Sequence, residues 1–281
     1  MTESLPVPYI LLPMSTKTKK PDKHWLYQHS VQDPEYEIQF MRRVYRKARG
    51  RRPLKLREDF CGTAVLACEW VRKVRGGTAI GLDLDRQTLA WAERNNSASL
   101  GAKSARLHLE HCNVLTASDW ESDIVAAFNF SYCVFKDRAT LLRYFRRARQ
   151  TLAEDGMLFL DLYGGPEAQV IQEERRSVEG DGFCFEYVWD QESYNPVTGE
   201  TICHIHFDLP DGSRIEKAFT YDWRLWNLPE LKDLLTEAGF TGVDVYWEGT
   251  DHVSGGGNGI FRISHKGDDA RSWICYLVAT K

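Results

Sequence analysis

Polar side chains end three short apolar segments in the first half of the chain, and their chemistry suits a nucleoside. These residues are Glu58, Asp83 and Asn113. A carboxylate such as Asp83 can accept hydrogen bonds from both hydroxyls of a ribose, and the amide of Asn113 can pair with the edge of an adenine. The alternative is that such groups at the ends of strands only cap the helices that follow.

A turn of small residues follows Glu58 and leads into a helix. Cys61-Gly62-Thr63 form the turn, and apolar residues at helical spacing come next. The sequence thus predicts a strand, a tight turn and a helix N-terminus. Such a unit brings backbone N–H groups close to a bound ligand. It opens most nucleotide-type cofactor sites in doubly wound α/β folds.

Strands and helices alternate along the first 165 residues. Asp33 and Pro34 predict the start of a helix that Gly50 ends. The patterns then predict strands at 54–59, 78–83, 106–110, 123–130 and 157–163, and helices at 63–74, 86–97 and 138–152. Short connections between such elements imply a mostly parallel sheet covered on both faces.

The pattern changes after Gly164. Segments with period-2 alternation fill 183–221, which predicts a small antiparallel sheet inserted into the α/β domain. A helix from Pro229 to Gly239 and strands at 243–247 and 273–279 follow, with 254–259 as a rim loop. The expected parts are 1–52 (N-terminal lid and helix), 53–165 (cofactor-binding core), 177–222 (inserted sheet) and 223–281 (the rest of the core sheet).

These features together resemble the S-adenosylmethionine-dependent methyltransferases of class I, with a Rossmann-like fold. The string EDFCGT (58–63) resembles a variant of the family's first motif, in which Phe60, Gly62 and Ala64 occupy the three glycine positions. Two of those glycines are therefore missing. The resemblance implies an α/β fold: a doubly wound, mostly parallel seven-stranded sheet with an antiparallel last strand, plus the inserted sheet.

The resemblance also implies how the cofactor S-adenosylmethionine would bind. Glu58, Phe60 and the backbone of Cys61 and Gly62 would face its methionine part. Asp83 matches the ribose-binding acid, with Leu84 beside the adenine. The pair that contacts the adenine matches Asn113 and Val114.

The acceptor site is expected beyond the carboxyl ends of the strands, near 129–132 and 161–163. Asn129 and Tyr132 stand in Asn-Phe-Ser-Tyr, which is similar to the Asn-Pro-Pro-Tyr of methyltransferases acting on exocyclic amines of bases, without the prolines. Tyr163 is the third candidate there. The alternative is that Asn129 contacts only the cofactor and Tyr132 packs in the core.

Two further segments are candidates for closing the site. Tyr27 could face the positively charged sulfur and His29 could act as a base, unless the segment 25–30 only anchors the terminus. After the inserted sheet, Arg224 could pair with a substrate carboxylate, with Trp226 beside it. An arginine at such a place more often bonds a backbone carbonyl or a glutamate.

Two other patterns carry less weight. Cys203, His204 and His206 lie on one expected strand, but no further ligands lie near them in the sequence, so we predict no metal. Between Arg42 and Arg57, nine of sixteen residues are Lys or Arg. Since acids offset this run elsewhere and the helix is amphipathic, we read it as a solvated face rather than a nucleic-acid footprint.

Composition describes an ordinary globular protein. The 281 residues carry a net charge of −4, which gives no pull toward nucleic acid or an anionic membrane. Seven cysteines, none in a Cys-x-x-Cys motif, indicate reduced thiols and a cytoplasmic location. Neither an apolar run of membrane length nor a convincing signal peptide is found. A homodimer is left open.

We therefore predict methyl transfer from S-adenosylmethionine to a small molecule by in-line displacement, without specifying nitrogen, oxygen, sulfur or carbon as the acceptor. One alternative is a methyltransferase of RNA, DNA or protein. A second is a cofactor-binding protein without catalysis, or a nicotinamide-dependent oxidoreductase. The oxidoreductase would need a Gly-x-Gly-x-x-Gly turn, which the sequence lacks.

Overall fold

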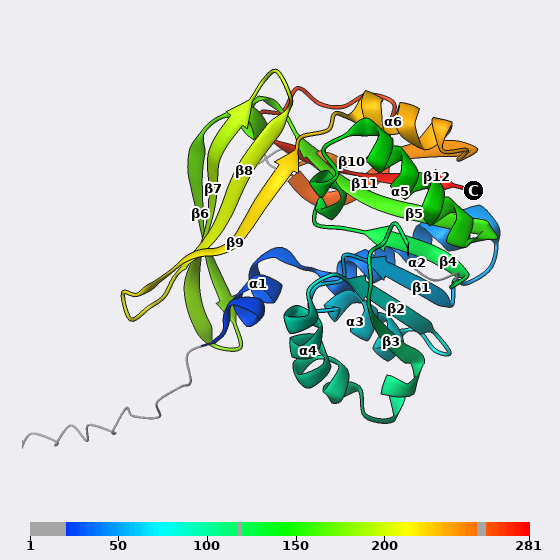
Figure 1. The fold of residues 1–281 in the computed structure, drawn as a ribbon, viewed down its shortest axis with the longest axis horizontal. Coiled ribbons are helices and arrows are strands. Elements are labelled where there is room, and N and C mark those ends of the chain that lie inside the picture. The colour runs from blue at the N-terminus through cyan, green and yellow to red at the C-terminus, as the bar shows by residue number, and fades with distance from the viewer. Residues whose placement is uncertain (1–20, 117–119, 252–256) are drawn as a thin grey trace, which may run out of the picture.

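Two sheets dominate the computed structural model, which describes residues 21–116, 120–251 and 257–281 (Figure 1). The large sheet has the order β11-β10-β12-β5-β4-β1-β2-β3, and the small sheet has the order β6-β7-β8-β9. The strands of the large sheet are β1 (Lys55–Asp59), β2 (Thr78–Asp83), β3 (Leu107–His111), β4 (Ser122–Ala127), β5 (Leu152–Gly164), β10 (Gly242–Thr250), β11 (Gly257–Ile263) and β12 (Trp273–Thr280). Those of the small sheet are β6 (Gln172–Gly180), β7 (Phe183–Asn195), β8 (Glu200–Asp208) and β9 (Arg214–Arg224).

The predicted fold class is confirmed. Strands β1 to β5 are parallel, and β12 runs antiparallel to both of its neighbours, β5 and β10. One correction concerns the loop expected at 254–259. Residues 252–256 lie outside the described residues, and Gly257 begins β11, which pairs with β10 and makes the sheet eight-stranded.

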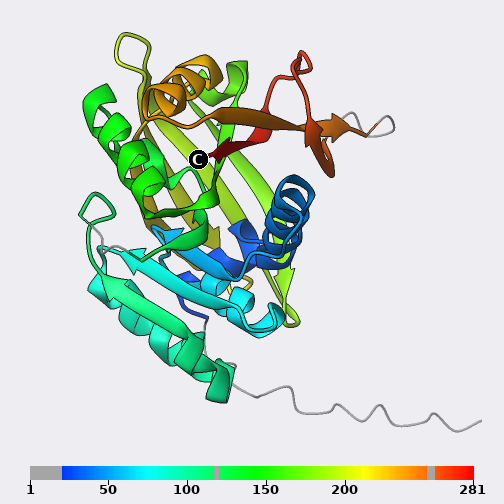
Figure 2. The same cartoon turned by 90° about the vertical axis from the view of Figure 1, so that its right-hand side faces the viewer.

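Helices α2 (Pro34–Arg49), α3 (Val65–Lys73), α4 (Arg86–Asn95), α5 (Arg138–Thr151) and α6 (Leu228–Glu237) cover the two faces of the large sheet, and α1 (Lys23–Val31) packs on the small sheet. Short 3-10 segments are η1 (Ser97–Arg106), η2 (Ser131–Val134) and η3 (Pro166–Gln169). Figure 2 shows α2 on the opposite side of the sheet from α5 and α6. None of the helices among the described residues is long and apolar enough to cross a membrane.

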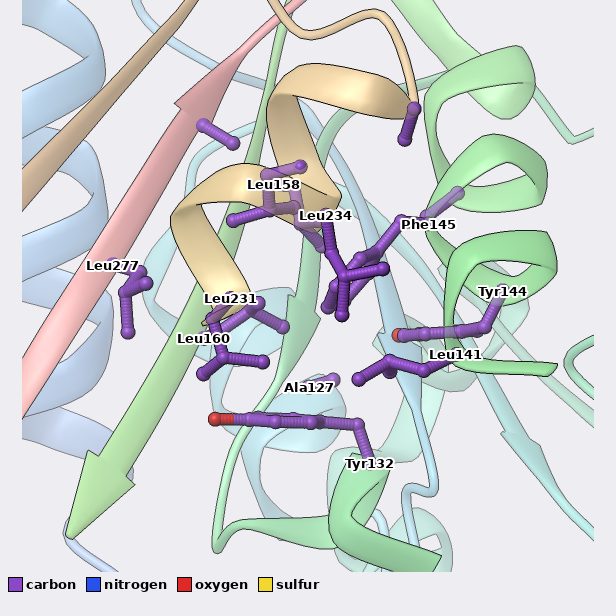
Figure 3. Close-up of a cluster of buried hydrophobic side chains, with 14 of the residues drawn as sticks. Ala127, Tyr132, Leu141, Tyr144, Phe145, Leu158, Leu160, Leu231, Leu234 and Leu277 are labelled. Atoms are coloured by element: carbon purple, nitrogen blue, oxygen red, sulfur yellow. The ribbon is translucent and has the colours of Figure 1, made fainter. Parts of the chain in front are cut away.

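The core on one face is formed where α5 and α6 pack on β4, β5 and β12. Figure 3 shows leucines of both helices against Leu158, Leu160 and Leu277 of the strands. The apolar residues of α5 recur three or four apart and so share one face of the helix, as the sequence predicts. This packing fixes the carboxyl ends of β4 and β5, where the loops of the site begin.

The inserted sheet begins earlier than expected, because β6 precedes the three predicted strands. It runs from Gln172 to Arg224 rather than from 177 to 222. Its inner face forms a separate apolar cluster with α1, in which Leu26 is completely buried. Helix α1, capped by Asp22, therefore joins the inserted sheet to the core; the other residues of the expected N-terminal lid, 1–20, lie outside the described residues.

Candidate active site

The turn after β1 keeps the backbone shape that its sequence pattern implies. Phe60, Gly62 and Ala64 all have left-handed φ angles, of 57°, 51° and 53°. These are the three positions at which the family pattern has glycine, the residue that adopts such angles without strain. A phenylalanine and an alanine held there are unusual, and backbone strain of this kind gathers at functional sites.

Asp83 holds this turn from the neighbouring strand. Its Oδ2 accepts a hydrogen bond from the Gly62 N–H at 2.7 Å, and its Oδ1 accepts one from Asp85 N–H at 2.8 Å. The carboxylate thus lies at the edge where the turn and the end of β2 meet. Leu84, next to it, is 62% exposed, an unusual position for a leucine that no other described element covers.

Asn113 lies after β3, the next strand along this edge. Its Oδ1 accepts a hydrogen bond from Leu115 N–H at 2.9 Å, which fixes the side chain. Val114 is buried, and its carbonyl accepts a bond from Arg57 Nη2 at 3.4 Å. The sheet order β1-β2-β3 therefore places the expected methionine, ribose and adenine residues side by side in that sequence.

Three buried carboxyl groups converge beside the turn. Glu58 and Asp161 lie near the carboxyl ends of β1 and β5, and Glu37 reaches in from α2; they are 6%, 8% and 9% exposed. Burial raises the pKa of Glu58 to about 8 and that of Asp161 to about 7, and it raises the pKa of Glu37 well above its usual range. The charges of Asp161 and Glu58 add to the effect on Glu37. Within the described residues, no Lys, Arg or His forms an ion pair with any of the three.

Asp161 also shapes the loop after β4. Its two carboxylate oxygens accept hydrogen bonds from the N–H groups of Asn129, at 2.7 Å, and Phe130, at 2.9 Å. Both residues have φ of 57°, so the carboxylate stabilises two successive left-handed residues. The loop therefore presents Asn129 and Phe130 at the carboxyl end of β4.

A cavity of about 190 Å³ opens beyond this loop, between the core, α1 and the inserted sheet. Seven aromatic side chains line it: Tyr27, Phe130, Tyr163, Tyr187, Trp189, Tyr221 and Trp223. Their rings contact one another, with centroids 4.7 Å apart for Phe130 and Tyr163 and 4.3 Å apart for Tyr221 and Trp223. Glu167 and Glu174 also line it. Among the described residues no Lys, Arg or His does.

Helix α1 covers the space between turn and cavity. Gln28 Nε2 donates a hydrogen bond to Thr63 Oγ1 at 2.6 Å, which ties the helix to the turn. Tyr27 lines the cavity and its hydroxyl shares a hydrogen bond with Tyr221; burial raises its pKa to about 12, so the phenol stays neutral. His29 does not line the cavity: its ring stacks on Trp25, and its Nδ1 lies 2.8 Å from the Trp25 carbonyl oxygen.

Three other expected site residues lie away from the cavity. Tyr132 is completely buried in the core shown in Figure 3, and its hydroxyl donates to the Asp161 carbonyl at 2.6 Å. Arg224 pairs with Glu230 at 2.9 Å and donates to the Lys136 carbonyl, and Trp226 is buried beneath its guanidinium. These contacts match the alternatives given for them from the sequence: Tyr132 packs in the core, and Arg224 bonds a backbone carbonyl and a glutamate.

Sequence reasoning missed Glu37, Asp161 and most of the aromatic lining. Asp161 stands near the end of the predicted strand 157–163, within the region expected for the acceptor, so its position could have been found from the sequence. The rings of β7 and β9 gave no signal, because alternation along a strand does not say which face meets the core. Tyr163 is the one expected acceptor-site tyrosine that lines the cavity, and its hydroxyl has no hydrogen-bond partner among the described residues.

Comparison with solved structures agrees with this arrangement. No protein-family model and no curated protein matches the sequence. Similar folds include an S-adenosylmethionine-dependent methyltransferase from Clostridium acetobutylicum (TM-score 0.66, 14% identity, covering 92% of this chain and 96% of that one). They also include the amino pentose methyltransferase CalS10 of Micromonospora echinaspora (TM-score 0.65, 17% identity, covering 92% of this chain and 95% of that one). A third is the sugar N-methyltransferase KedS8 of a Streptoalloteichus species (TM-score 0.64, 17% identity, covering 99% of each chain).

The chain has the class I methyltransferase fold. It shares this fold, including the part that carries the inserted sheet, with proteins of nearly the same length. The strand-end residues described above lie at the carboxyl ends of β1, β2 and β3 in this fold, and the aromatic cavity begins at the loop after β4.

Proposed function

We propose that this protein transfers a methyl group from S-adenosylmethionine to a small amine. The observation that carries the proposal is the aromatic cavity, which has two glutamates and no basic side chain among its described lining residues. Aromatic faces attract ammonium groups through their quadrupole. The Glu174 carboxylate adds to the attraction, whereas Glu167 is already paired with Arg271 at 3.0 Å. A carboxylate or phosphate acceptor would instead need a cationic partner, which this lining does not offer.

The residues along the edge of β1, β2 and β3 fit the cofactor. Asp83 would accept the ribose hydroxyls, and its oxygens, each with one backbone donor, keep free acceptor positions. Leu84 would cover one face of the adenine, and Asn113 and Val114 would meet its edge. The left-handed turn at Phe60, Cys61 and Gly62 lets the backbone approach the methionine part closely.

The cluster of Glu37, Glu58 and Asp161 supports a ligand with positive charge. Three buried carboxyls without a basic partner among the described residues make ionisation costly, and a nearby cation would relieve that cost. When bound, S-adenosylmethionine supplies an electrophilic methyl group on a positively charged sulfur, and it also carries an ammonium group. The expectation is that the carboxyls ionise when the cofactor binds.

The cavity residues would orient the acceptor. An amine docks as an ammonium ion and must lose a proton before its lone pair can react. The exposed Glu174 at the cavity can receive that proton and pass it to solvent, while Tyr163, with its unpaired hydroxyl, can accept a hydrogen bond from the neutral amine. Burial raises the pKa of Tyr163, so this hydroxyl stays protonated and does not act as the base.

Calorimetric titration with S-adenosylmethionine, S-adenosylhomocysteine and NADH tests the cofactor. We expect micromolar binding of the two adenosyl ligands and none of NADH. The acceptor is tested by mass-spectrometric detection of S-adenosylhomocysteine with size-matched probes, benzylamine against benzoate. Turnover of the amine alone supports the proposal, whereas turnover of the acid alone would contradict the assignment of the cavity.

One surface feature bears on the nucleic-acid alternative. Arg42, Arg43, Arg46, Lys47 and Arg52 line a hollow of about 560 Å³ on the outer side of α2. This hollow ends at Pro53, beside the amino end of β1, whereas the candidate site is at the carboxyl ends of the strands. A nucleic acid bound there would be held at the wrong end of the sheet for the cavity.

The size of the cavity also favours a small acceptor. Its volume of about 190 Å³ is below the roughly 300–1,000 Å³ of most ligand pockets.

A further inference from the structure

Two buried histidines lie on the face of the inserted sheet that is turned away from the cavity. Ile205 of β8 lines the cavity, so by alternation its neighbours His204 and His206 point to the other face. They are only 3% and 1% exposed. A buried imidazole needs partners, and here the partners come from both neighbouring strands.

Carboxylates surround these two rings. His204 Nε2 lies 2.7 Å from Glu192 Oε2, and His206 Nε2 lies 3.3 Å from Asp190 Oδ2. Glu216 Oε1 lies 3.2 Å from His206 Nδ1. Three acids therefore meet two histidines within one patch, although the sequence separates Asp190 from His204 by a whole hairpin.

The two strands that flank β8 are both irregular at this patch. The register of β7 shifts between Gln191 and Ser193, so that Glu192 is the extra residue of a bulge. On the other side, the register of β9 shifts opposite His206, and Lys217 has a φ of 45°. Bulges re-aim side chains, and here they direct Glu192 toward His204.

We propose that Asp190, Glu192 and His204 bind a divalent transition-metal ion such as Zn²⁺ on the outer face of the inserted sheet. One ligand atom from each residue lies within 4.8 Å of the other two, and a side-chain movement of up to about 1.5 Å would bring them to the spacing of roughly 3.3 Å that a tetrahedral zinc requires. Imidazole nitrogen with two carboxylates is a ligand set that zinc accepts, with water in the fourth position. The proposal does not depend on the proposed methyl transfer.

Neighbouring groups already orient these ligands. Thr220 Oγ1 lies 2.9 Å from His204 Nδ1, so Nδ1–H can donate to the hydroxyl once an ion replaces the proton that Nε2 shares with Glu192. The Lys217 N–H donates to His206 Nδ1 at 3.0 Å, so His206 Nε2 carries its proton toward Asp190. Such partners fix the tautomer and orientation of metal ligands.

Lys217 is the expected competitor of the metal. Its Nζ lies 2.6 Å from Glu192 Oε2, where it supplies the positive charge that the acids require. The side chain is half-exposed and can swing into solvent when an ion binds. Removing its charge should therefore strengthen metal binding, which an ordinary ion-pair network would not predict.

Because the patch lies on the opposite face from the cavity, we assign the ion a structural role. An ion on Asp190, Glu192 and His204 would link β7 to β8 at the irregular point of their pairing. Binding to the folded state alone would then raise the thermal midpoint of the protein.

The test is titration of untagged protein with Co²⁺, followed by its visible ligand-field absorption, and with Zn²⁺ by calorimetry. Wild type should bind one ion per chain, and Glu192→Gln, which keeps the side-chain shape, should lose that binding. Thr220→Val should weaken binding by about 10–100-fold, and Lys217→Met should tighten it. His108→Ala, on the far sheet, serves as the histidine control and should bind as wild type does.

The outcomes separate the alternatives. The proposal would be overturned if wild type bound no ion in the micromolar range while all variants were folded by circular dichroism. The patch would then be an ordinary network of hydrogen bonds and ion pairs among these side chains. Binding that survives Glu192→Gln and His204→Ala but is lost on blocking thiols would place the ion at a cysteine and also overturn it. A rise in thermal midpoint with Zn²⁺ in wild type and none in Glu192→Gln would support it without any assay of activity.

Discussion

Buried carboxyl groups occur in two neighbouring regions of this protein, and the two regions treat them in opposite ways. Asp59, at the end of β1, is 1% exposed and lies beside Arg57, which is completely buried. Glu58, the residue between them, points to the other face of the strand and belongs to the cluster with Glu37 and Asp161. One region carries its own cation, and the other carries none among the described residues.

Both members of the Arg57–Asp59 pair make several hydrogen bonds, to each other and to α5. Arg57 Nε and Nη2 donate to the two oxygens of Asp59 at 2.6 and 3.3 Å. Its Nη1 donates to Thr151 Oγ1 at 3.0 Å, and the Tyr144 hydroxyl donates to Asp59 at 2.9 Å. The pair thus fastens β1 to α5. A buried charge is tolerated when it is paired and hydrogen-bonded in this way.

In the cluster of Glu37, Glu58 and Asp161, by contrast, only backbone N–H groups are bound. Glu58 accepts from Ala67 N–H at 2.9 Å, and Asp161 accepts from the loop after β4. The cost of this arrangement is shown by the raised pKa values. The difference teaches that adjacent acids in one motif can serve stability and ligand binding separately, because alternate residues of a strand face opposite sides.

The largest expected effect is on the paired acid. Asp59→Asn leaves Arg57 buried without its counter-charge, and we expect the free energy of unfolding to fall by about 3–5 kcal/mol. Urea denaturation followed by circular dichroism measures this. Asp155→Asn, which removes a half-exposed partner of Arg51, is the matched control and should cost about 1 kcal/mol or less. Equal losses in the two variants would show that Asp59 is not a structural anchor.

The unpaired acid should behave in the opposite sense. The pKa of Glu58 is raised to about 8, so the unfolded chain ionises near pH 4.5 while the folded one does not, and folding loses stability as pH rises between these values. Glu58→Gln escapes this loss, and we expect it to exceed wild type by about 3–5 kcal/mol at pH 9 and by little at pH 4. Urea denaturation at both pH values measures the gap.

The same variant should bind the cofactor less well. Losing a charged partner of the ligand is expected to weaken S-adenosylmethionine binding by about 1.5–3 kcal/mol in calorimetry. The exposed Glu93 provides the control, since Glu93→Gln should change neither property. A Glu58→Gln protein that is no more stable than wild type at pH 9 would mean that the pKa of Glu58 is not raised, because another group in the fold compensates its charge.

Asp83 should affect the cofactor more than the fold. Asp83→Ala leaves the ribose hydroxyls unpaired and should weaken binding of S-adenosylmethionine by about 1–3 kcal/mol. Asp85→Ala is the neighbouring control: Asp85 caps α4 through Gln87 and Thr88, so its loss should cost about 1 kcal/mol of stability and no affinity. Unchanged affinity in a folded Asp83→Ala protein would remove the ribose assignment.

The smallest effect is expected in the cavity. Trp189→Leu removes one aromatic face while keeping an apolar lining, and we expect KM for an amine acceptor to rise by the equivalent of about 0.5–2 kcal/mol. KM for the cofactor should stay as in wild type. Trp91→Leu, on α4 and outside the cavity, is the matched control. A rise in cofactor KM alone would show that Trp189 lies on the cofactor side instead.

Much of the fold could be read from local patterns. The helix at Pro34–Arg49 begins and ends where Asp33 and Gly50 predict, because caps act on adjacent backbone groups. The turn at Cys61 and Gly62 also follows from local sequence. The strand β11 could not be foreseen from its glycines, since its backbone is stabilised by pairing with β10 rather than by its own residues.

The site divides in the same way. The cofactor edge at Glu58, Asp83 and Asn113 was predictable, since the carboxyl ends of adjacent parallel strands must lie together. Whether Tyr132 and Arg224 reached the cavity was not, since each could be bound by groups far away in sequence: Asp161 and Lys136. Whether His29 reached the cavity was also unpredictable, because it depended on which side of α1 faces the core.

The sequence by itself determined most of the elements, the parallel arrangement of the core strands and the row of strand-end residues, because period, caps and turns depend on neighbours along the chain. Only the tertiary structure decided which buried acids have a cation, which rings enclose the cavity, and that Asp190 and Glu192 meet His204. Those are contacts across strands and between sheets. They depend on the register of the strands, which is set by packing and pairing over the whole domain, so no local sequence pattern predicts them.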